Sequence, residues 1–329
     1  MLIPRYWSRA ESQAVTPAGK PVRFHVWRGS RSSPAEAQSL AQEAVGRVAA
    51  RIQAGAGFPE RYTYGDRPLR EEVVREFPAA ASADPPDAAI TRNSYGALVL
   101  NAARAFFIDV DVPAADTPPT SRPATPPATS HPLWGLVDAL PVPPGLRSIA
   151  ETFLGPRSPA PAAPPPAPSP GGWTPGDPPT APLARLRNWI ASHPDWRVRV
   201  YRTHSGMRYL VTHAPFSPTD AEVQATMTAL GADPQYIRLC QVQKSFRARL
   251  TPKPWRVGTE NPPVTFPYET GADEQSMREW ERRYDAASGG RATCLFVEEL
   301  GSGVEHPDIA PLRALHDEQT RATSGLPLA

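Results

Sequence analysis

Residues 105–112, Ala-Phe-Phe-Ile-Asp-Val-Asp-Val, are apolar up to Ile108 and then alternate between polar and apolar side chains, and this pattern predicts a largely buried β-strand. Successive side chains of a strand point to opposite faces. Ile108 and Val110 therefore lie on one face, and Asp109 and Asp111 lie on the other. Two carboxylates on an otherwise apolar strand are costly to bury unless cations compensate them. The pair therefore holds a metal ion, pairs with arginines of the same chain, or ends the strand at solvent.

The N-terminal region alternates strand and helix signals. Residues 22–27 have the period of a half-buried strand, and apolar residues between 40 and 52 recur at helical spacing. Ser33 suits the N-cap of this helix, Pro34 its first position, and Glu36 completes a capping box.

The segments that follow this region, and the C-terminal segments, give weaker patterns. Residues 69–77 predict a shorter helix, and residues 89–100 predict two strands around a turn at 93–96. The C-terminal region is expected to hold a helix, a strand and a helix, around residues 277–284, 293–297 and 309–315 respectively.

The second half of the chain predicts a regular supersecondary unit. Its patterns are helical at 183–190, alternating at 197–203 and 207–212, helical between Ser217 and Gly231, and alternating at 245–250. With the strand at 105–112 placed first, this order is β-α-β-β-α-β, the ferredoxin-like split βαβ unit. We therefore expect an α+β protein with an RRM-like palm, an N-terminal α/β extension and a Pro-rich disordered insertion.

Composition sets the expected boundaries. Of 43 prolines, 22 lie between residues 113 and 182, where they remove backbone donors and favour extended polyproline II structure. An apolar island at 132–154 is either a docking helix or part of a surface insertion. The expected parts are the N-terminal α/β region at 1–112, the Pro-rich insertion or linker at 113–182, the remaining palm at 183–256, and a C-terminal extension packed on the palm at 257–329.

Charge is distributed unevenly although the net charge is only +2. Residues 185–256 hold 12 lysines and arginines against 4 acids, whereas residues 257–329 hold 6 against 13. A basic region beside an acidic one suits a nucleotide or nucleic-acid partner, and it suits intramolecular charge pairing equally well. The Pro-rich segment is a candidate arm for a protein partner.

Several functional classes are disfavoured by what the sequence lacks. Cys240 and Cys294 lie too far apart for a CxxC motif, which excludes a disulfide scaffold and a cysteine-based zinc cluster. The sequence has no P-loop, dinucleotide-binding glycine motif, GxSxG or HExxH. It also lacks a signal peptide and any window long enough to span a membrane, so we expect a cytoplasmic protein with no membrane partner.

The predicted strands bring charged side chains together if they share one sheet. Helices then cover the face with Ile108 and Val110, while the opposite face gathers Asp109, Asp111, Arg199, Tyr201, Arg247, Arg249 and Lys253. Carboxylates of this set can hold a metal ion and guanidinium groups can bind phosphate oxygens. The same side chains are also sufficient for an ionic layer that satisfies itself.

The order of motifs resembles the archaeo-eukaryotic primase superfamily, which includes primase-polymerases. Residues 106–111 match the hhDhD strand of that family. Residues 203–210 look like its Ser-Gly-x turn, but Arg208 stands where the family has a histidine, with His204 and His213 flanking the motif. Residues 246–253 resemble its basic strand. The resemblance covers about half of the chain.

The resemblance implies a metal-dependent nucleotidyltransferase. Asp109 and Asp111 would be the catalytic residues and would hold Mg²⁺ or Mn²⁺. The side chains expected to contact the nucleotide or nucleic acid are Ser205, Arg208, Arg247, Arg249 and Lys253. A third catalytic acid is not placed, and Glu298 and Glu299 are candidates.

Two other functions remain open. The substituted histidine position favours a degenerate relative, a binding or regulatory module without catalysis. A DxD glycosyltransferase is a further alternative, and it expects a parallel βαβ fold in the first 100 residues. His204 and His213 are expected either to bind a metal as a pair or simply to be exposed. Trp255 is expected either to stack on a nucleic-acid strand or to anchor a packed loop.

Overall fold

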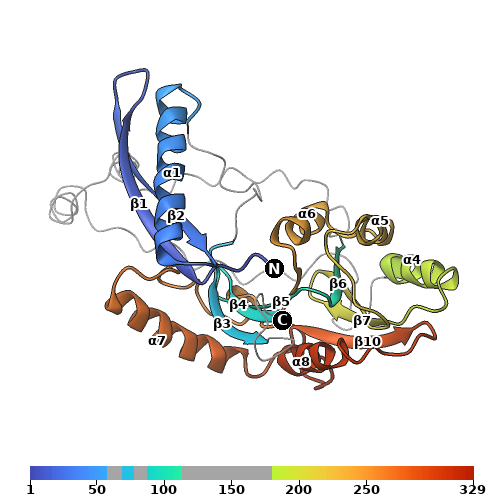
Figure 1. Cartoon of the computed structure of the whole chain (residues 1–329). Helices are drawn as coiled ribbons and strands as arrows, with labels where there is room; N and C mark the ends of the chain where they lie inside the picture. The colour runs from blue at the N-terminus through green and yellow to red at the C-terminus, as the bar shows by residue number, and fades with distance from the viewer. Residues whose placement is uncertain (58–68, 78–86, 113–179) are drawn as a thin grey trace, which may run out of the picture. The chain divides into compact units, whose positions relative to one another are not determined.

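The protein is a mixed α+β structure with three antiparallel sheets and six α-helices among the residues that the structure describes (Figure 1). This structure is a computed structural model, and it describes residues 1–57, 69–77, 87–112 and 180–329. All of these belong to one unit that excludes residues 113–174. The expected Pro-rich insertion, except for its last three residues, and its apolar island lie outside the described residues. Within the described ranges, no helix combines the length and apolar character that crossing a bilayer requires.

Every pair of neighbouring strands is antiparallel. The first sheet is a hairpin of β1 (Tyr6–Val15) and β2 (Pro21–Ser30). The second has the order β3 (Glu72–Phe77), β4 (Ala88–Arg92), β5 (Leu98–Ala102) and β9 (Phe246–Arg249). The third has the order β10 (Cys294–Leu300), β7 (Val198–Thr203), β8 (Gly206–Val211) and β6 (Phe106–Asp111).

The helices are α1 (Pro34–Gln53), α4 (Thr180–Ala191), α5 (Ala221–Leu230), α6 (Pro234–Gln243), α7 (Gly271–Ser288) and α8 (Ala310–Thr320). As expected, Ser33 caps α1 by accepting a hydrogen bond of 3.1 Å from the backbone N–H of Glu36. The carboxylate of Glu36 does not close a capping box, because it accepts a hydrogen bond from the Ser30 hydroxyl instead.

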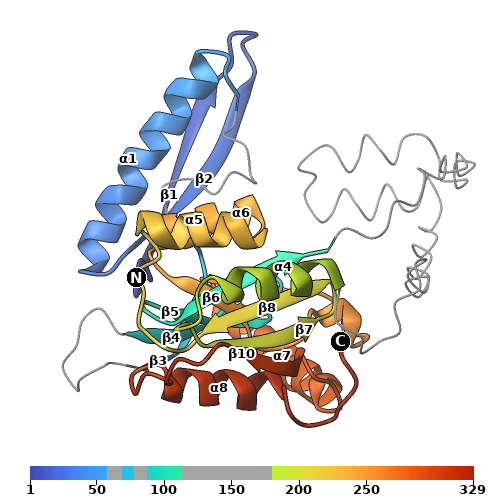
Figure 2. The same ribbon diagram turned by 90° about the vertical axis from the view of Figure 1, so that its right-hand side faces the viewer.

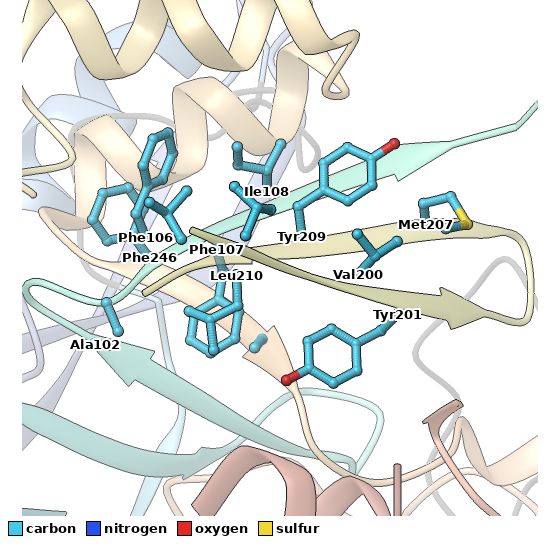
Figure 3. Packing of buried hydrophobic residues seen from close by; sticks show 14 of the residues in the cluster. Ala102, Phe106, Phe107, Ile108, Val200, Tyr201, Met207, Tyr209, Leu210 and Phe246 are labelled. Atoms are coloured by element: carbon cyan, nitrogen blue, oxygen red, sulfur yellow. The ribbon is translucent and has the colours of Figure 1, made fainter. Parts of the chain in front are cut away.

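Helices pack on both faces of the third sheet (Figure 2). Tyr209 and Tyr201 point to opposite sides of this sheet (Figure 3). The Tyr209 hydroxyl donates to the carbonyl of Pro182 in α4, 3.1 Å away. The Tyr201 hydroxyl donates to Asp317 of α8, 2.6 Å away. Figure 2 shows α4 and α8 on either side of these strands. Helix α8 therefore covers much of the polar face, and for Arg199 and Tyr201 this favours the ionic layer, one of the two alternatives that the sequence left open.

The segment 69–77 contains strand β3, at Glu72–Phe77, instead of the expected helix. Val73 and Val74 are β-branched and suit a strand. The partner strand is available in β4, where Glu72 lies opposite Arg92 and Phe77 lies opposite Ala88. Pairing with another part of the chain has therefore outweighed the local apolar spacing.

The strand at 245–250 does not join the sheet of β6. Its β9 pairs with β5, so the expectation of one continuous palm sheet is wrong. The two sheets meet instead through Tyr236 of α6, whose hydroxyl lies 3.0 Å from the carbonyl oxygen of Phe107 in β6 and 2.9 Å from that of Arg247 in β9. Because the hydroxyl has one proton, the two carbonyls share one donor at this junction.

We expect Tyr236→Phe to lower the free energy of unfolding by about 1–2 kcal/mol, because two carbonyls at the junction then lose their shared donor. Urea denaturation measures this change. Tyr6→Phe is the matched control, since Tyr6 is an exposed residue of β1 and its loss of a hydroxyl should cost less than about 0.5 kcal/mol. Equal effects of the two substitutions would contradict a structural role of the Tyr236 hydroxyl.

Candidate functional site

A pocket of about 270 Å³ lies where β6, β8, β9 and α6 approach one another. It is lined by six of the seven residues that the sequence proposes for the site: Asp109, Asp111, Ser205, Arg208, Arg249 and Lys253. It is also lined by Asp233 and Arg256, which were not among those seven.

The turn between β7 and β8 forms one rim of the pocket. Gly206 lies directly opposite Asp111 in the β6–β8 ladder. A Cβ atom at this position would lie 2.0 Å from the carbonyl oxygen of Val110, so only glycine permits this approach. The close packing places Ser205 at the pocket.

Asp109 is bound by Arg208. The two residues lie opposite each other on β6 and β8, and the guanidinium group donates to both carboxylate oxygens, from Nε at 2.7 Å and from Nη2 at 2.9 Å. The Arg208 side chain is only 2% exposed, whereas that of Asp109 is 33% exposed. Arginine pairing, one of the alternatives that the sequence left open, therefore holds for Asp109.

Helix α8 holds Arg208 in this position. The Nη1 group of Arg208 lies 3.4 Å from Nε2 of His316 and donates to the carbonyl of Arg249 at 2.9 Å. On its other side, Nδ1 of His316 lies 3.3 Å from the Asp317 carboxylate. Burial, followed by the charge of Arg208, lowers the pKa of His316 to about 4. A neutral ring with its proton on Nδ1 satisfies both contacts.

Asp111 faces the pocket without an ion pair to any described residue. Partial burial raises its pKa, and the negative charges of Asp109 and Asp233 raise it further. Asp233 is the N-cap of α6, where its side chain accepts a hydrogen bond of 3.0 Å from the backbone N–H of Gln235. One wall of the pocket thus collects acidic groups.

Three cations form the other wall. Burial lowers the pKa of Lys253, and so do the charges of Arg249 and Arg256. Burial and the charge of Arg249 lower the pKa of Arg256 to about 10. Nε of Arg249 and Nη1 of Arg256 are buried with no hydrogen-bond partner among the residues described. Unpaired buried N–H groups and crowded positive charges both favour a bound anion.

The two histidines near the motif lie at opposite ends of β8, so the structure does not bring them together as a metal pair. His204 lies beside the pocket, where burial and then the charge of Arg256 lower its pKa to about 4. His213 packs with its ring centroid 4.8 Å from that of Trp196.

Three residues expected on the polar face lie away from the pocket. Arg247 donates to Glu71 at 2.7 Å and also binds Asn101. Arg199 and Tyr201 are held by Asp317 of α8. Arg199 and Tyr201 lie on the same face of the third sheet as Asp109, whereas Arg247 belongs to the second sheet, and other elements supply the partners of all three.

The candidates for a third acid also lie elsewhere. Glu298 pairs with Arg187 at 2.7 Å, and Glu299 pairs with Arg197 at 2.5 Å. Asp233 is the acid that does line the pocket. Its sequence context, Asp followed by Pro, indicates only the start of a helix and does not show which residues lie near it in the fold. Arg256 was not among the residues proposed from the sequence, and the signal that could have found it is its place after Lys253 in a basic stretch.

The pocket residues fit a divalent cation only if Asp109 shares its carboxylate oxygens between the cation and Arg208. Such ions prefer several oxygen ligands. Asp111 offers a carboxylate, but Asp109 would have to share its oxygens with Arg208. Across the described ranges, no group of three or more acidic, histidine or cysteine side chains is arranged to hold a metal ion.

No protein-family model, no curated protein and no solved structure matches the chain. The resemblance to primase-polymerases therefore depends on the sequence motifs alone.

We expect the stability that His316 contributes to depend on pH. Its folded pKa of about 4 lies below the ordinary value of 6.5, so between these values the unfolded chain takes up a proton that the folded chain does not. Stability should therefore fall as the pH decreases from about 6.5 to 4, by up to about 1.4 kcal/mol per pH unit.

His316→Gln removes this titration while keeping an acceptor for Arg208. Urea denaturation of parent and variant across this range measures the difference in unfolding free energy, in which contributions from other groups cancel. As the pH falls, the unfolding free energy of the variant should increase relative to that of the parent. A difference that does not change with pH would contradict the lowered pKa of His316.

Proposed function

We propose that this pocket binds the phosphate groups of a nucleotide or nucleic acid, on a palm related to those of primase-polymerases. The observation that carries the proposal is the convergence of Arg249, Lys253 and Arg256 in one pocket with unpaired buried N–H groups. Guanidinium and ammonium groups are the usual ligands of phosphate oxygens.

The strand arrangement supports the family part of the proposal. The antiparallel order β7–β8–β6 is the order that three strands of an RRM-like palm would have. In such a palm the fourth strand would pair with β6, and here β9 is linked to β6 through the hydroxyl of Tyr236.

The proposed chemistry is in-line attack of a 3′ oxygen on the α-phosphate of a nucleoside triphosphate. The new bond joins the 3′ oxygen to the α-phosphorus, the bond from that phosphorus to the α–β bridging oxygen breaks, pyrophosphate leaves, and the proton of the 3′ hydroxyl passes to water. Arg249, Lys253 and Arg256 would bind and orient the triphosphate. Asp111, with Asp109 sharing its oxygens, would hold Mg²⁺ or Mn²⁺, which stabilises the charge that develops on the phosphate.

The pairing of Asp109 with Arg208 favours a second candidate, phosphate binding without catalysis. A guanidinium group already neutralises this carboxylate, through 2.7 and 2.9 Å hydrogen bonds. Binding to the cations does not require that pair to open. A metal site that used both aspartates would require Asp109 to reorganise.

The glycosyltransferase alternative draws no support from the N-terminal strands. It expects a parallel βαβ fold, whereas every pairing among the described strands β1 to β5 is antiparallel.

We expect the double variant Lys253→Gln plus Arg256→Gln to bind inorganic triphosphate about 10- to 100-fold more weakly than the parent. The estimate corresponds to losing hydrogen bonds between charged groups. Isothermal titration calorimetry measures the dissociation constants. Lys20→Gln is the matched control, because Lys20 is an exposed residue just before β2 and should leave binding unchanged. No binding by the parent, or equal binding by the double variant, would refute the proposed site.

A second measurement separates catalysis from binding. Mn²⁺-dependent incorporation of labelled nucleotides by the parent, lost in Asp109→Ala plus Asp111→Ala, would establish the transferase. Absence of incorporation together with triphosphate binding would establish the binding-only candidate.

A further inference from the structure

Trp255 is the most exposed of the described tryptophans, with half of its surface accessible. It lies between Lys253 and Arg256, two of the cations of the pocket. Its ring lies next to the Lys253 ammonium, although it does not itself line the pocket, and it has no part in the binding described so far.

The loop that carries Trp255 is anchored by other residues. Pro252 and Pro254 are both buried, and the Pro252 carbonyl accepts a hydrogen bond of 2.5 Å from the Tyr284 hydroxyl. The carbonyl of Pro254 accepts two backbone hydrogen bonds of 3.0 Å, which close a short 3₁₀ turn at Pro254–Arg256. Anchoring, which the sequence offered as a role for Trp255, is thus provided by its proline neighbours.

The position of the ring is defined from two sides. The Tyr95 ring, in the β4–β5 turn, contacts it edge-on with a centroid distance of 5.6 Å. The Lys253 ammonium lies 5.4 Å from its centroid. Because the same ammonium lines the pocket, a phosphate bound to Lys253 has its attached nucleoside within reach of the exposed indole surface.

We infer that Trp255 is a positioning residue that stacks on the base of the ligand whose phosphates occupy the pocket. This inference rests on the proposed function, and it goes further by requiring a nucleobase in the ligand. A half-exposed aromatic ring, held edge-on by Tyr95 beside a cationic wall, combines stacking with phosphate binding, the two means by which proteins hold unpaired nucleotides. The base belongs either to a free nucleotide or to a single strand.

Titration calorimetry with three probes tests this inference: ATP, a short single-stranded oligothymidylate and inorganic triphosphate. Trp255→Ala should weaken binding of at least one base-containing probe about tenfold, the usual effect of removing one stacking partner. It should leave the dissociation constant of triphosphate within about twofold. A loss confined to ATP identifies a free nucleotide, and a loss confined to the oligothymidylate identifies a strand.

Two further variants exclude a merely structural effect. Trp255→Phe keeps an aromatic face and should restore most of the affinity. The quenching of tryptophan emission on binding should be smaller in Trp255→Phe than in the parent. Tyr6→Ala removes an exposed aromatic residue of β1 and should change neither.

The failures of the two proposals are distinguishable. If the parent binds triphosphate but Trp255→Ala binds both base-containing probes as tightly as the parent, the stacking role is refuted and the phosphate site stands. If the parent does not bind triphosphate, the proposed function fails and the stacking role fails with it.

Discussion

The ion pair between Asp109 and Arg208 is the interaction on which the candidate site depends. A charge inside a sheet must be compensated, because burying an unpaired carboxylate or guanidinium costs several kcal/mol. Arg208 meets this requirement while contacting the backbone of Arg249 and the ring of His316. One buried guanidinium group therefore links β6, β8, the end of β9 and α8 beneath the pocket. The register of β6 against β8 makes the pair possible, because it places the two residues directly opposite each other.

The charged residues outside this pair determine the electrostatics of the pocket. Burial, and then the nearby acids, raise the pKa of Asp111, whereas burial, and then the nearby Arg249, lower the pKa values of Lys253 and Arg256. Like charges are thus held close together on both walls. A ligand that carries phosphate groups would relieve repulsion on the cationic wall, and an accompanying metal ion would relieve it on the acidic wall. This polarity is the physical reason to prefer a phosphate-containing ligand over an apolar one.

Much of the local structure was predictable because it is encoded by neighbouring residues. The strand at 105–112, the turn at 93–96 and the hairpin around Ser205 and Gly206 follow from alternation and turn chemistry, and all are present. The helix expected at 69–77 is wrong because its residues find a partner strand in β4. The placement of 245–250 is wrong for the same reason, since β5 pairs with it instead of β6. Sequence patterns indicate whether a segment has the periodicity of a helix or of a strand. They do not indicate which strand will pair with it.

The sequence by itself determined that Asp109 and Asp111 share one face of a buried strand, and that basic residues follow the last strand of the second half. Both depend only on side-chain alternation and local composition. Tertiary structure alone decided that Arg208 pairs with Asp109, that Arg247 pairs with Glu71, and that Asp233 enters the pocket. These outcomes depend on strand register and on how separate elements pack. The two ion pairs join residues 99 and 176 positions apart, so no local pattern contains them.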